Sequence, residues 1–278
     1  MTELIEGATP PPMNETRSHV VEAVDKSRVL PESERKQSEL DIRVIIPTYN
    51  EKENIADLVR QILALDGNMR VVVVDDNSPD GTGQLVDGLA EQNARVSVIH
   101  RGGKLGLGTA YIAGLKQGIG EGADQLITMD ADFSHNPADI PALVALADRF
   151  PITLGSRYVP HARVLDCGWL RRALSWGANA FARTLLGLRA RDCTTGFRCY
   201  QREVLLTIDL DRFFSNGYSF LIEMLFRCQR RGYRVGETPI IFANRKRGRS
   251  KISRREIYKA VYTVLRLSVT RLIPWQPA

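Results

Sequence analysis

The sequence predicts an α/β protein with a doubly wound, mostly parallel sheet and helices on both faces. Short apolar runs recur about every 25–30 residues, and a segment with helical periodicity separates each run from the next. This alternation is typical of βαβ units, whose strands pair in parallel. The runs that we expect to form strands are Val44–Ile46, Val71–Val74, Val96–Ile99, Leu126–Met129 and Ile152–Leu154.

The segments between these runs carry apolar residues at helical spacing. In the first segment one face is formed by Ile55, Leu58, Val59, Ile62 and Leu63. The regular alternation ends after Tyr158. From there we expect helices over 164–191 and 217–231, an extended segment over 233–242 that completes the sheet, and a last helix that starts near Ser253.

Three regions are expected along the chain. Residues 1–41 contain Pro10–Pro12, few aromatic residues and many charges, which predicts a disordered or loosely ordered leader. Residues 42–252 are predicted to form one α/β domain, and residues 253–278 a basic amphipathic helix. A chain of 278 residues with 44% apolar residues is long enough for one large domain with such appendages.

The net charge of +6 is distributed unevenly. The first 41 residues carry nine acidic and five basic residues, so the remainder of the chain carries a net charge of +10. From Arg245 to the C-terminus there are ten Lys or Arg residues and one acidic residue, Glu256. This distribution predicts that the tail contacts phosphates or an anionic surface.

Targeting signals and metal-binding cysteines are not evident in the sequence. No run approaches the roughly 20 apolar residues that cross a bilayer, and the N-terminus does not resemble a signal peptide. We therefore expect a cytoplasmic protein. Neither Cys-x-x-Cys spacing nor a neighbouring His indicates zinc, so we expect reduced, structural cysteines at Cys167, Cys193, Cys199 and Cys228.

Two carboxylates one residue apart, Asp130 and Asp132, follow the fourth apolar run. Ligands of open α/β sheets bind outside the carboxyl ends of the strands, where two oxygen donors can hold a divalent cation against a phosphorylated ligand. A helix cap beside a solvated acid would be the alternative for an isolated Asp-x-Asp. Here, further acids follow the first two runs, and a cation would relieve their mutual repulsion.

The acidic cluster after the second run contains Asp75, Asp76 and Asp80. The segment 78–81, Ser-Pro-Asp-Gly, has the composition of a β-turn, which explains part of the cluster without any function. A carboxylate can also accept hydrogen bonds from a guanine or uracil edge or from ribose. We favour this role above all for Asp76, and less strongly for Asp75 and Asp80.

The glycine-rich segment 102–108 matches neither Gly-x-Gly-x-x-Gly nor a Walker loop. We predict a turn that leads into a helix, with Lys104 available to contact a phosphate.

Positive charge is expected where a phosphate ligand would need it. Arg157 ends the fifth run, and Arg171 and Ser175 share one helix face. Two arginines and a hydroxyl can bind a phosphate monoester. The basic segment Arg245–Lys251 is predicted to close over a diphosphate, with a nucleic-acid patch as the alternative.

In combination, the motifs of this chain resemble those of the polyprenol-phosphate (dolichol-phosphate) mannosyltransferases of glycosyltransferase family 2, which have a GT-A fold. The resemblance runs from about Arg43 to Lys251. Its motifs are Pro-Thr-Tyr-Asn-Glu at 47–51, Asp-Asp-x-Ser-Pro-Asp-Gly-Thr at 75–82, Lys-Leu-Gly-Leu-Gly-Thr-Ala-Tyr at 104–111, Met-Asp-Ala-Asp-x-Ser-His at 129–135, Gly-Ser-Arg-Tyr at 155–158, Thr-Thr-Gly-Phe-Arg at 194–198 and Phe-x-x-Arg-x-x-Gly-x-Ser-Lys at 242–251.

The resemblance implies roles for individual residues. The guanosine of GDP-mannose would be held by Pro47, Tyr49, Glu51, Val74 and Asp76. Metal and donor diphosphate would be held by Asp130, Ala131 and Asp132, with Arg245 and Lys251 on the phosphates. Ser134 stands where some relatives place a Gln ligand, so a third metal ligand is in doubt. The lipid phosphate would be seated by Arg157, Arg171 and Ser175.

The resemblance further implies an inverting transfer of mannose from GDP-mannose to a polyprenyl phosphate, with Mg²⁺ or Mn²⁺ as the cofactor and catalysis by Asp130, Asp132 and Arg157. A sister enzyme that uses a UDP-sugar is the nearest alternative, and a non-catalytic nucleotide- or nucleic-acid-binding protein is a more distant one. We expect no nucleic acid as partner.

The lipid acceptor implies a protein that is peripheral on the cytoplasmic face of the membrane. Relatives with C-terminal transmembrane segments differ from this chain, which suggests a separate integral membrane protein as an anchor. Its last helix suits either the membrane interface or packing on the domain. The helix with Trp169 and Trp176 is a second candidate for lipid contact.

Overall fold

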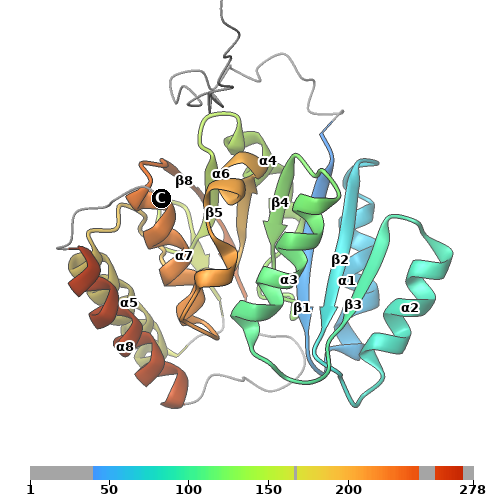
Figure 1. Cartoon of the computed structure of the whole chain (residues 1–278), viewed down its shortest axis with the longest axis horizontal. Helices are drawn as coiled ribbons and strands as arrows, with labels where there is room; N and C mark the ends of the chain where they lie inside the picture. The colour runs from blue at the N-terminus through green and yellow to red at the C-terminus, as the bar shows by residue number, and fades with distance from the viewer. Residues whose placement is uncertain (1–39, 166–167, 244–253, 272–278) are drawn as a thin grey trace, which may run out of the picture. The chain divides into compact units, whose positions relative to one another are not determined.

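The computed structural model describes residues 40–165, 168–243 and 254–271. Their main feature is a seven-stranded sheet with the strand order β3-β2-β1-β4-β7-β5-β8 (Figure 1). Neighbouring pairs are parallel except where β7 (Arg198–Gln201) pairs with its two neighbours. The parallel strands are β1 (Ile42–Thr48), β2 (Met69–Asp75), β3 (Val96–His100), β4 (Gln125–Thr128), β5 (Ile152–Ser156) and β8 (Val235–Pro239). The predicted fold class is confirmed.

Helices cover both faces of the sheet (Figure 1). One face packs on α1 (Lys52–Leu63), α2 (Thr82–Gln92) and α4 (Ile140–Ala147), which follows the short 3₁₀ turn η2 (Pro137–Asp139). The other packs on α3 (Leu107–Gly120), α6 (Arg202–Thr207) and α7 (Ser219–Arg230), with the 3₁₀ turn η3 (Leu210–Arg212) between the last two. Helices α5 (Trp169–Leu186) and α8 (Arg254–Arg271) contact each other at the side of α7.

The apolar core has two layers because successive strand residues point to opposite faces. In β1, Ile45 packs in the layer of α3, whereas Val44 and Ile46 pack in the layer of α1 and α4. The central parallel strands β1 and β2 therefore read as nearly continuous apolar runs, as expected for strands covered on both sides.

The antiparallel strand β7 was not predicted. It lies between β4 and β5, so these two predicted strands are not neighbours. The four-residue strand begins with a charged residue, Arg198, whose side chain is fully buried. No apolar alternation therefore marks this segment as a strand in the sequence.

The predicted helix over 164–191 is shorter in the structure. The short strand β6 (Arg163–Val164) pairs with β9 (Ile241–Phe242), and α5 ends at Gly187, which adopts a left-handed conformation with φ of 64°. A left-handed glycine after the last helical residue is a common way to end a helix.

Helix α8 packs on the domain and also leaves apolar side chains exposed. Val264 and Leu267 are buried in the core, whereas Ile257, Val261 and Leu265 are exposed. The structure therefore shows this helix packed on the domain, and contact of its exposed residues with a membrane interface stays a prediction. Of the predicted leader over 1–41, only Leu40 and Asp41 are among the described residues, and Leu40 is buried.

Three of the predicted structural cysteines, Cys193, Cys199 and Cys228, are buried free thiols. Burial raises the pKa of each to about 12, so none is suited to act as a thiolate nucleophile. Cys167 lies outside the described residues.

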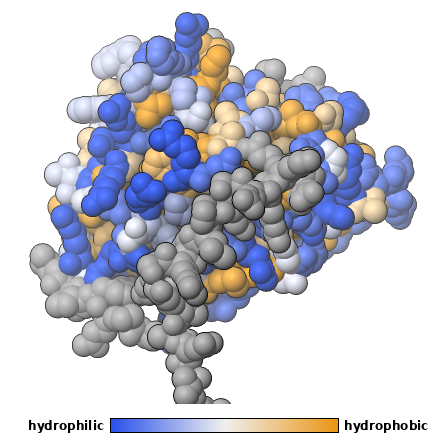
Figure 2. Space-filling model, turned by 90° about the horizontal axis from the view of Figure 1, so that it is seen from above, coloured by the Kyte–Doolittle hydropathy of each residue, from blue (hydrophilic) through white to orange (hydrophobic). Residues whose placement is uncertain are grey.

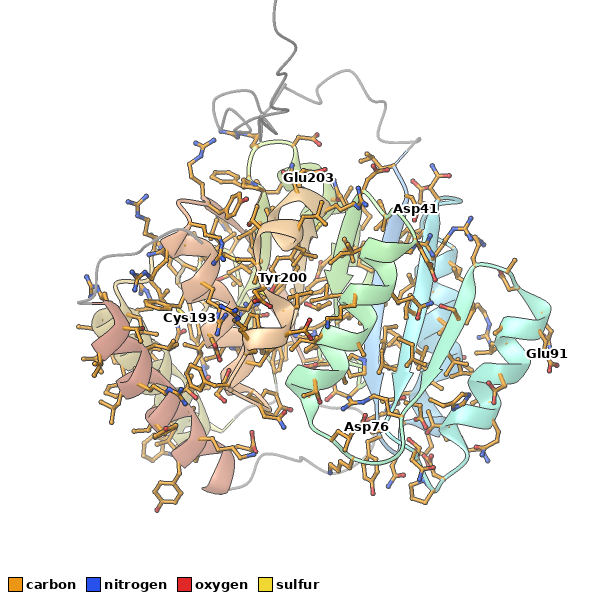
Figure 3. All side chains as sticks on the ribbon, viewed as in Figure 1. Asp41, Asp76, Glu91, Cys193, Tyr200 and Glu203 are labelled. Carbon is orange, nitrogen blue, oxygen red and sulfur yellow. The ribbon has the colours of Figure 1, made fainter. Side chains whose placement is uncertain are left out.

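The edge of the sheet at which the parallel strands begin is seen from above in Figure 2. Polar residues cover most of its described surface, and apolar residues show between them. The acidic motifs lie at the other edge, where Asp76 is labelled in Figure 3.

Candidate active site

A pocket of about 460 Å³ opens where the parallel strands β1, β2 and β4 end. Its lining includes Pro47 and Tyr49 after β1, Asp76 after β2, and Asp130 and Asp132 after β4. From β1 the chain continues to β2 and β3 on one side and then crosses to β4 on the other side of β1. The pocket therefore lies at the topological switch point, where open α/β sheets bind ligands.

The loop after β1 supplies an aromatic side and an acidic side of the pocket. The ammonium group of Lys104 lies 4.3 Å from the ring centroid of Tyr49, so these two residues approach each other across the opening. Glu51 is buried and accepts a hydrogen bond of 2.9 Å from the side chain of Asn54. The structure thus places Lys104 in one pocket lining with Pro47, Thr48, Tyr49 and Glu51 of the 47–51 motif.

The carboxylates after β2 have different roles. Asp75 accepts hydrogen bonds from the hydroxyl of Thr48 and from the backbone and hydroxyl of Ser78, at 2.5–2.9 Å. Asp80 accepts two from Thr82, at 2.6 and 3.0 Å. Both therefore stabilise the turn, and neither lines the pocket.

Asp76 is the carboxylate of this loop that faces the pocket. It forms an ion pair of 2.9 Å with Arg101 that lacks hydrogen-bond geometry. Burial raises the pKa of Asp76, and Arg101 together with the backbone N–H groups of Gly106 and Leu105 limits this rise. Arg101 was not singled out in the sequence, because nothing local marks it as the partner of Asp76.

The loop after β4 has an unusual backbone. Phe133 adopts φ of 59°, a left-handed conformation that is rare for a bulky residue and frequent at functional sites. The turn lets the backbone N–H of Ser134 donate to Asp132 at 3.0 Å. Ser134 itself is buried and does not line the pocket, so nothing here supports a third metal ligand at that position.

Asp130 is held from two directions. The hydroxyl of Tyr111 donates to its Oδ1 at 2.8 Å, and its backbone N–H donates to Nδ1 of His135 at 3.4 Å. Burial, reinforced by the charge of Asp130, raises the pKa of Tyr111 well above its usual value, so the phenol remains a donor. Burial lowers the pKa of His135, which favours its neutral form.

These residues fit a divalent cation that is shared with a phosphorylated ligand. Among the described residues no group of three or more His, Cys, Asp or Glu side chains could enclose a metal ion. Mg²⁺ is usually held by one or two carboxylates together with substrate phosphates, and Mn²⁺ likewise prefers oxygen donors. Asp130 and Asp132, which line the same pocket, provide that donor set.

Arg157 is committed to a buried ion pair that the sequence did not reveal. Its Nε and Nη2 donate to the two carboxylate oxygens of Asp192 at 2.8 Å each, and Nη2 also donates to Thr194 at 2.7 Å. Burial alone would raise the pKa of Asp192, but the charge and hydrogen bonds of Arg157 hold it below its usual value. Arg157 lies outside the pocket lining.

The other predicted residues are placed as follows. Ser175 shares a hydrogen bond of 2.8 Å with the hydroxyl of Tyr158, beside Arg157 in sequence. Val74 is buried inside β2 and does not line the pocket. Arg245 and Lys251 lie outside the described residues, as does the side chain of Arg171.

A further side of the pocket was missed in the sequence. It is formed by residues 216–218 before α7 and by Glu256 and Lys259 of α8. The carboxylate of Glu256 accepts a hydrogen bond of 3.4 Å from the backbone of Tyr218 and pairs with Lys259 at 2.8 Å. The last helix therefore contributes to the pocket as well as to the exposed surface.

Comparison with solved structures defines the class of fold. Glucosyl-3-phosphoglycerate synthase from Mycobacterium tuberculosis, solved with Mn²⁺, UDP and phosphoglyceric acid, matches with a TM-score of 0.60 over 86% of this chain and 81% of that chain. The sequence identity is 18%, so this likeness concerns the fold alone, which is GT-A-like.

The sequence relatives then define the family. The model of glycosyl transferase family 2 matches residues 43–209. Polyprenol monophosphomannose synthase of Mycolicibacterium smegmatis is 44% identical over 80% of this chain and 84% of that protein. Undecaprenyl-phosphate mannosyltransferase of Micrococcus luteus is 41% identical over 81% of this chain and 93% of that protein. This chain belongs to glycosyl transferase family 2 and, within it, to the polyprenyl-phosphate mannosyltransferases.

Among the described residues, no helix combines the length and the apolar character that a membrane span requires.

Proposed function

We propose that the chain transfers mannose from GDP-mannose to a polyprenyl phosphate, with inversion at the anomeric carbon and with Mg²⁺ or Mn²⁺ bound by Asp130 and Asp132. The names of both relatives support a mannosyl donor and a polyprenyl phosphate acceptor. The observation that carries the proposal is the pocket at the ends of β1, β2 and β4, where an aromatic ring and Asp76 lie in the same cavity as the Asp130–Asp132 pair.

Each side of the pocket suits one part of the donor. Tyr49 offers a ring face to the base, as aromatic side chains commonly do for nucleobases. Glu51 and Asp76 offer carboxylate oxygens to the base edge and the ribose hydroxyls. Lys104 and Lys259 are the cationic side chains of the described lining and suit the diphosphate, together with the predicted contacts of Arg245 and Lys251.

The chemistry needs no protein base. A phosphate monoester has a second pKa near about 6, so the acceptor is largely a dianion at neutral pH and is already a nucleophile. A bound divalent cation would stabilise the charge of the departing diphosphate. The residues of the chain hold donor and acceptor in line, and in-line attack on an α-linked donor gives a β-linked product.

Arg157 is proposed to bind the phosphate of the lipid acceptor. Asp192 balances the charge of Arg157 and fixes its guanidinium, which leaves the planar group pre-organised for further contacts. The other residues predicted to bind this phosphate are Arg171 and Ser175, which lie four residues apart on α5.

Donor selectivity provides the first test. With Mn²⁺ present, we expect the purified chain to bind GDP at least about tenfold more tightly than UDP, and Tyr49→Ala to weaken GDP binding by about 1–3 kcal/mol through loss of base stacking. Isothermal titration calorimetry measures both effects. Tighter binding of UDP would move the assignment to a UDP-sugar transferase. Strong, salt-dependent oligonucleotide binding without nucleotide binding would favour a nucleic-acid-binding protein.

The acceptor lipid requires contact with a membrane, and the surface of α5 and α8 suits that contact. Trp169 and Trp176 on α5 are 79% and 65% exposed. Further exposed apolar residues of the two helices are Leu174, Phe181, Ile257, Tyr258, Val261, Tyr262, Leu265 and Val269. Tryptophan and tyrosine favour the membrane interface, so we propose that this surface lies on the cytoplasmic face of the membrane, with an integral membrane protein as an additional anchor.

Vesicle flotation tests the membrane proposal. We expect Trp169→Ser/Trp176→Ser to lower partitioning into anionic phosphatidylglycerol vesicles at least about tenfold, because two interfacial side chains are lost. Leu206→Ser, which removes an exposed apolar residue on α6, is the control and should leave partitioning unchanged. Equal partitioning of all three proteins would contradict the assigned surface. Wild-type binding to protein-free vesicles that equals binding to cell membranes would make a separate anchor unnecessary.

A further inference from the structure

The hydrogen bond between Tyr111 and Asp130 joins two motifs that have no other assigned connection. Tyr111 lies on α3, 19 residues before Asp130 in the sequence, and its side chain is fully buried. Its hydroxyl donates to Oδ1 of Asp130 over 2.8 Å. A buried donor of this kind fixes the orientation of the carboxylate that it binds.

Gly196 packs directly against this hydrogen bond. A Cβ atom at position 196 would lie 3.0 Å from the hydroxyl of Tyr111 and 3.3 Å from Oδ1 of Asp130. Both distances are shorter than ordinary van der Waals contacts. A side chain at this position would therefore press on the pair of oxygen atoms and displace them by a few tenths of an ångström, which the glycine avoids.

The backbone around Gly196 is itself held in place. Thr128 at the end of β4 donates to the carbonyl oxygen of Gly196 over 2.7 Å. The buried guanidinium of Arg198 donates to the carbonyl oxygens of Thr195, Cys193 and Leu221 at 2.8–2.9 Å. Because β7 lies on the other side of β4 from β1 and β2, these bonds hold the backbone on the side of Asp130 that faces away from the loops after β1 and β2.

We propose that Tyr111 is a positioning residue that orients Asp130 toward the divalent cation, and that Gly196 leaves the room in which this hydrogen bond keeps its geometry. This inference rests on the proposed role of Asp130 as a metal ligand. The tyrosine of the 104–111 motif and the glycine of the 194–198 motif would then act together, because both lie beside the carboxylate of Asp130 and neither is proposed to bind the cation itself. Outer-shell partners of metal ligands commonly change metal affinity by about 10–100-fold when they are removed.

The test is direct Mn²⁺ binding, followed by the electron paramagnetic resonance signal of free Mn²⁺ in the presence of GDP. We expect Tyr111→Phe, which keeps the ring and removes the hydroxyl, to weaken Mn²⁺ binding about tenfold or more. The matched control is Tyr233→Phe. The hydroxyl of Tyr233 shares a hydrogen bond of 3.0 Å with Thr207, and Tyr233 neither lines the pocket nor contacts Arg198 through its hydroxyl. This variant should bind Mn²⁺ as the wild type does.

Gly196→Ala is a second variant, in which the added methyl group disturbs the same hydrogen bond without removing the hydroxyl. It tests the inference if Tyr111→Phe does not fold. We expect it to weaken Mn²⁺ binding in the same direction. Wild-type Mn²⁺ affinity in the folded Tyr111→Phe protein, or an equal loss in Tyr111→Phe and Tyr233→Phe, would overturn the inference. A wild-type protein that binds no Mn²⁺ with GDP present would overturn the proposed metal site, and the inference with it.

Discussion

Replacement of Asp132 by alanine is expected to abolish mannosyl transfer, with a loss of at least about 10³-fold in kcat/KM. Asp132 is one of two carboxylates that offer oxygen donors where the donor diphosphate is proposed to bind. Removing one ligand of the cation removes stabilisation of the departing diphosphate, and about 4 kcal/mol of transition-state stabilisation corresponds to about 10³-fold in rate. The measurement is the rate at which labelled mannose enters an organic-extractable lipid.

A control separates this effect from a general loss of charge. Asp148 is an exposed acid at the end of α4, and Asp148→Ala removes the same side chain at a distance from the pocket. That variant should retain wild-type turnover. If Asp132→Ala also turned over at a near-normal rate, the assignment of a metal role to this carboxylate would be refuted.

The second large effect concerns stability. Replacement of Asp192 by alanine is expected to lower the free energy of unfolding by about 3–5 kcal/mol, because it leaves the charge of Arg157 buried without its partner. The side chains of Asp192 and Arg157 are 0% and 15% exposed, and the pair is joined by two hydrogen bonds of 2.8 Å. For a domain of this size such a loss lowers the melting temperature by roughly 6–20 °C.

The exposed pair of Arg60 and Asp57 on α1 provides the comparison. Its side chains are 75% and 55% exposed, and its N–O distance of 2.7 Å is similar to that of the buried pair. Surface pairs of this kind contribute about 0–1 kcal/mol, so Asp57→Ala should change the melting temperature by only a few degrees at most. Thermal unfolding followed by circular dichroism measures both variants. An equally small change for Asp192→Ala would show that Arg157 has another partner or moves into solvent.

The parallel part of the fold could be predicted because its signal is local. The five predicted runs lie in β1 to β5 with at most one residue outside the strand, as Val71–Val74 lies within β2, and their spacing indicates that helices connect them. Strand β7 could not be predicted in this way. Its position depends on pairing with β4 and β5 at the same time and on burial of Arg198, whose hydrogen bonds reach as far as Leu221.

The candidate site shows the same division. Tyr49, Asp76, Asp130 and Asp132 lie in motifs at strand ends, where the topology of an open α/β sheet brings them into one pocket. Their supporting partners were missed because those contacts join segments far apart in sequence. Tyr111 on α3 reaches Asp130 in the loop after β4, 19 residues away, and the partner of Arg157 lies 35 residues away.

In the glycine-rich segment and the last helix, the local sequence pattern did not show which other residues each side chain contacts. The sequence indicated that Lys104 could contact a phosphate, and the structure places it over Tyr49 at the pocket. The basic character of the tail predicted contact with anions, but periodicity alone did not show that Glu256 and Lys259 line the pocket. The apolar stripe of α8 was also ambiguous, because Val264 packs inward whereas Val261 is exposed.

The central claim is tested most directly by transfer of labelled mannose from GDP-mannose into lipid by the purified full chain. The reaction contains Mg²⁺ and a panel of polyprenyl phosphates, with UDP-glucose in a parallel reaction and the Asp132→Ala protein as the blank. We predict a lipid-linked mannosyl product from GDP-mannose with the wild-type chain, and neither a product from UDP-glucose nor one from the blank. A product from UDP-glucose alone, or equal product from the wild type and the blank, would contradict the proposed donor and the proposed active site.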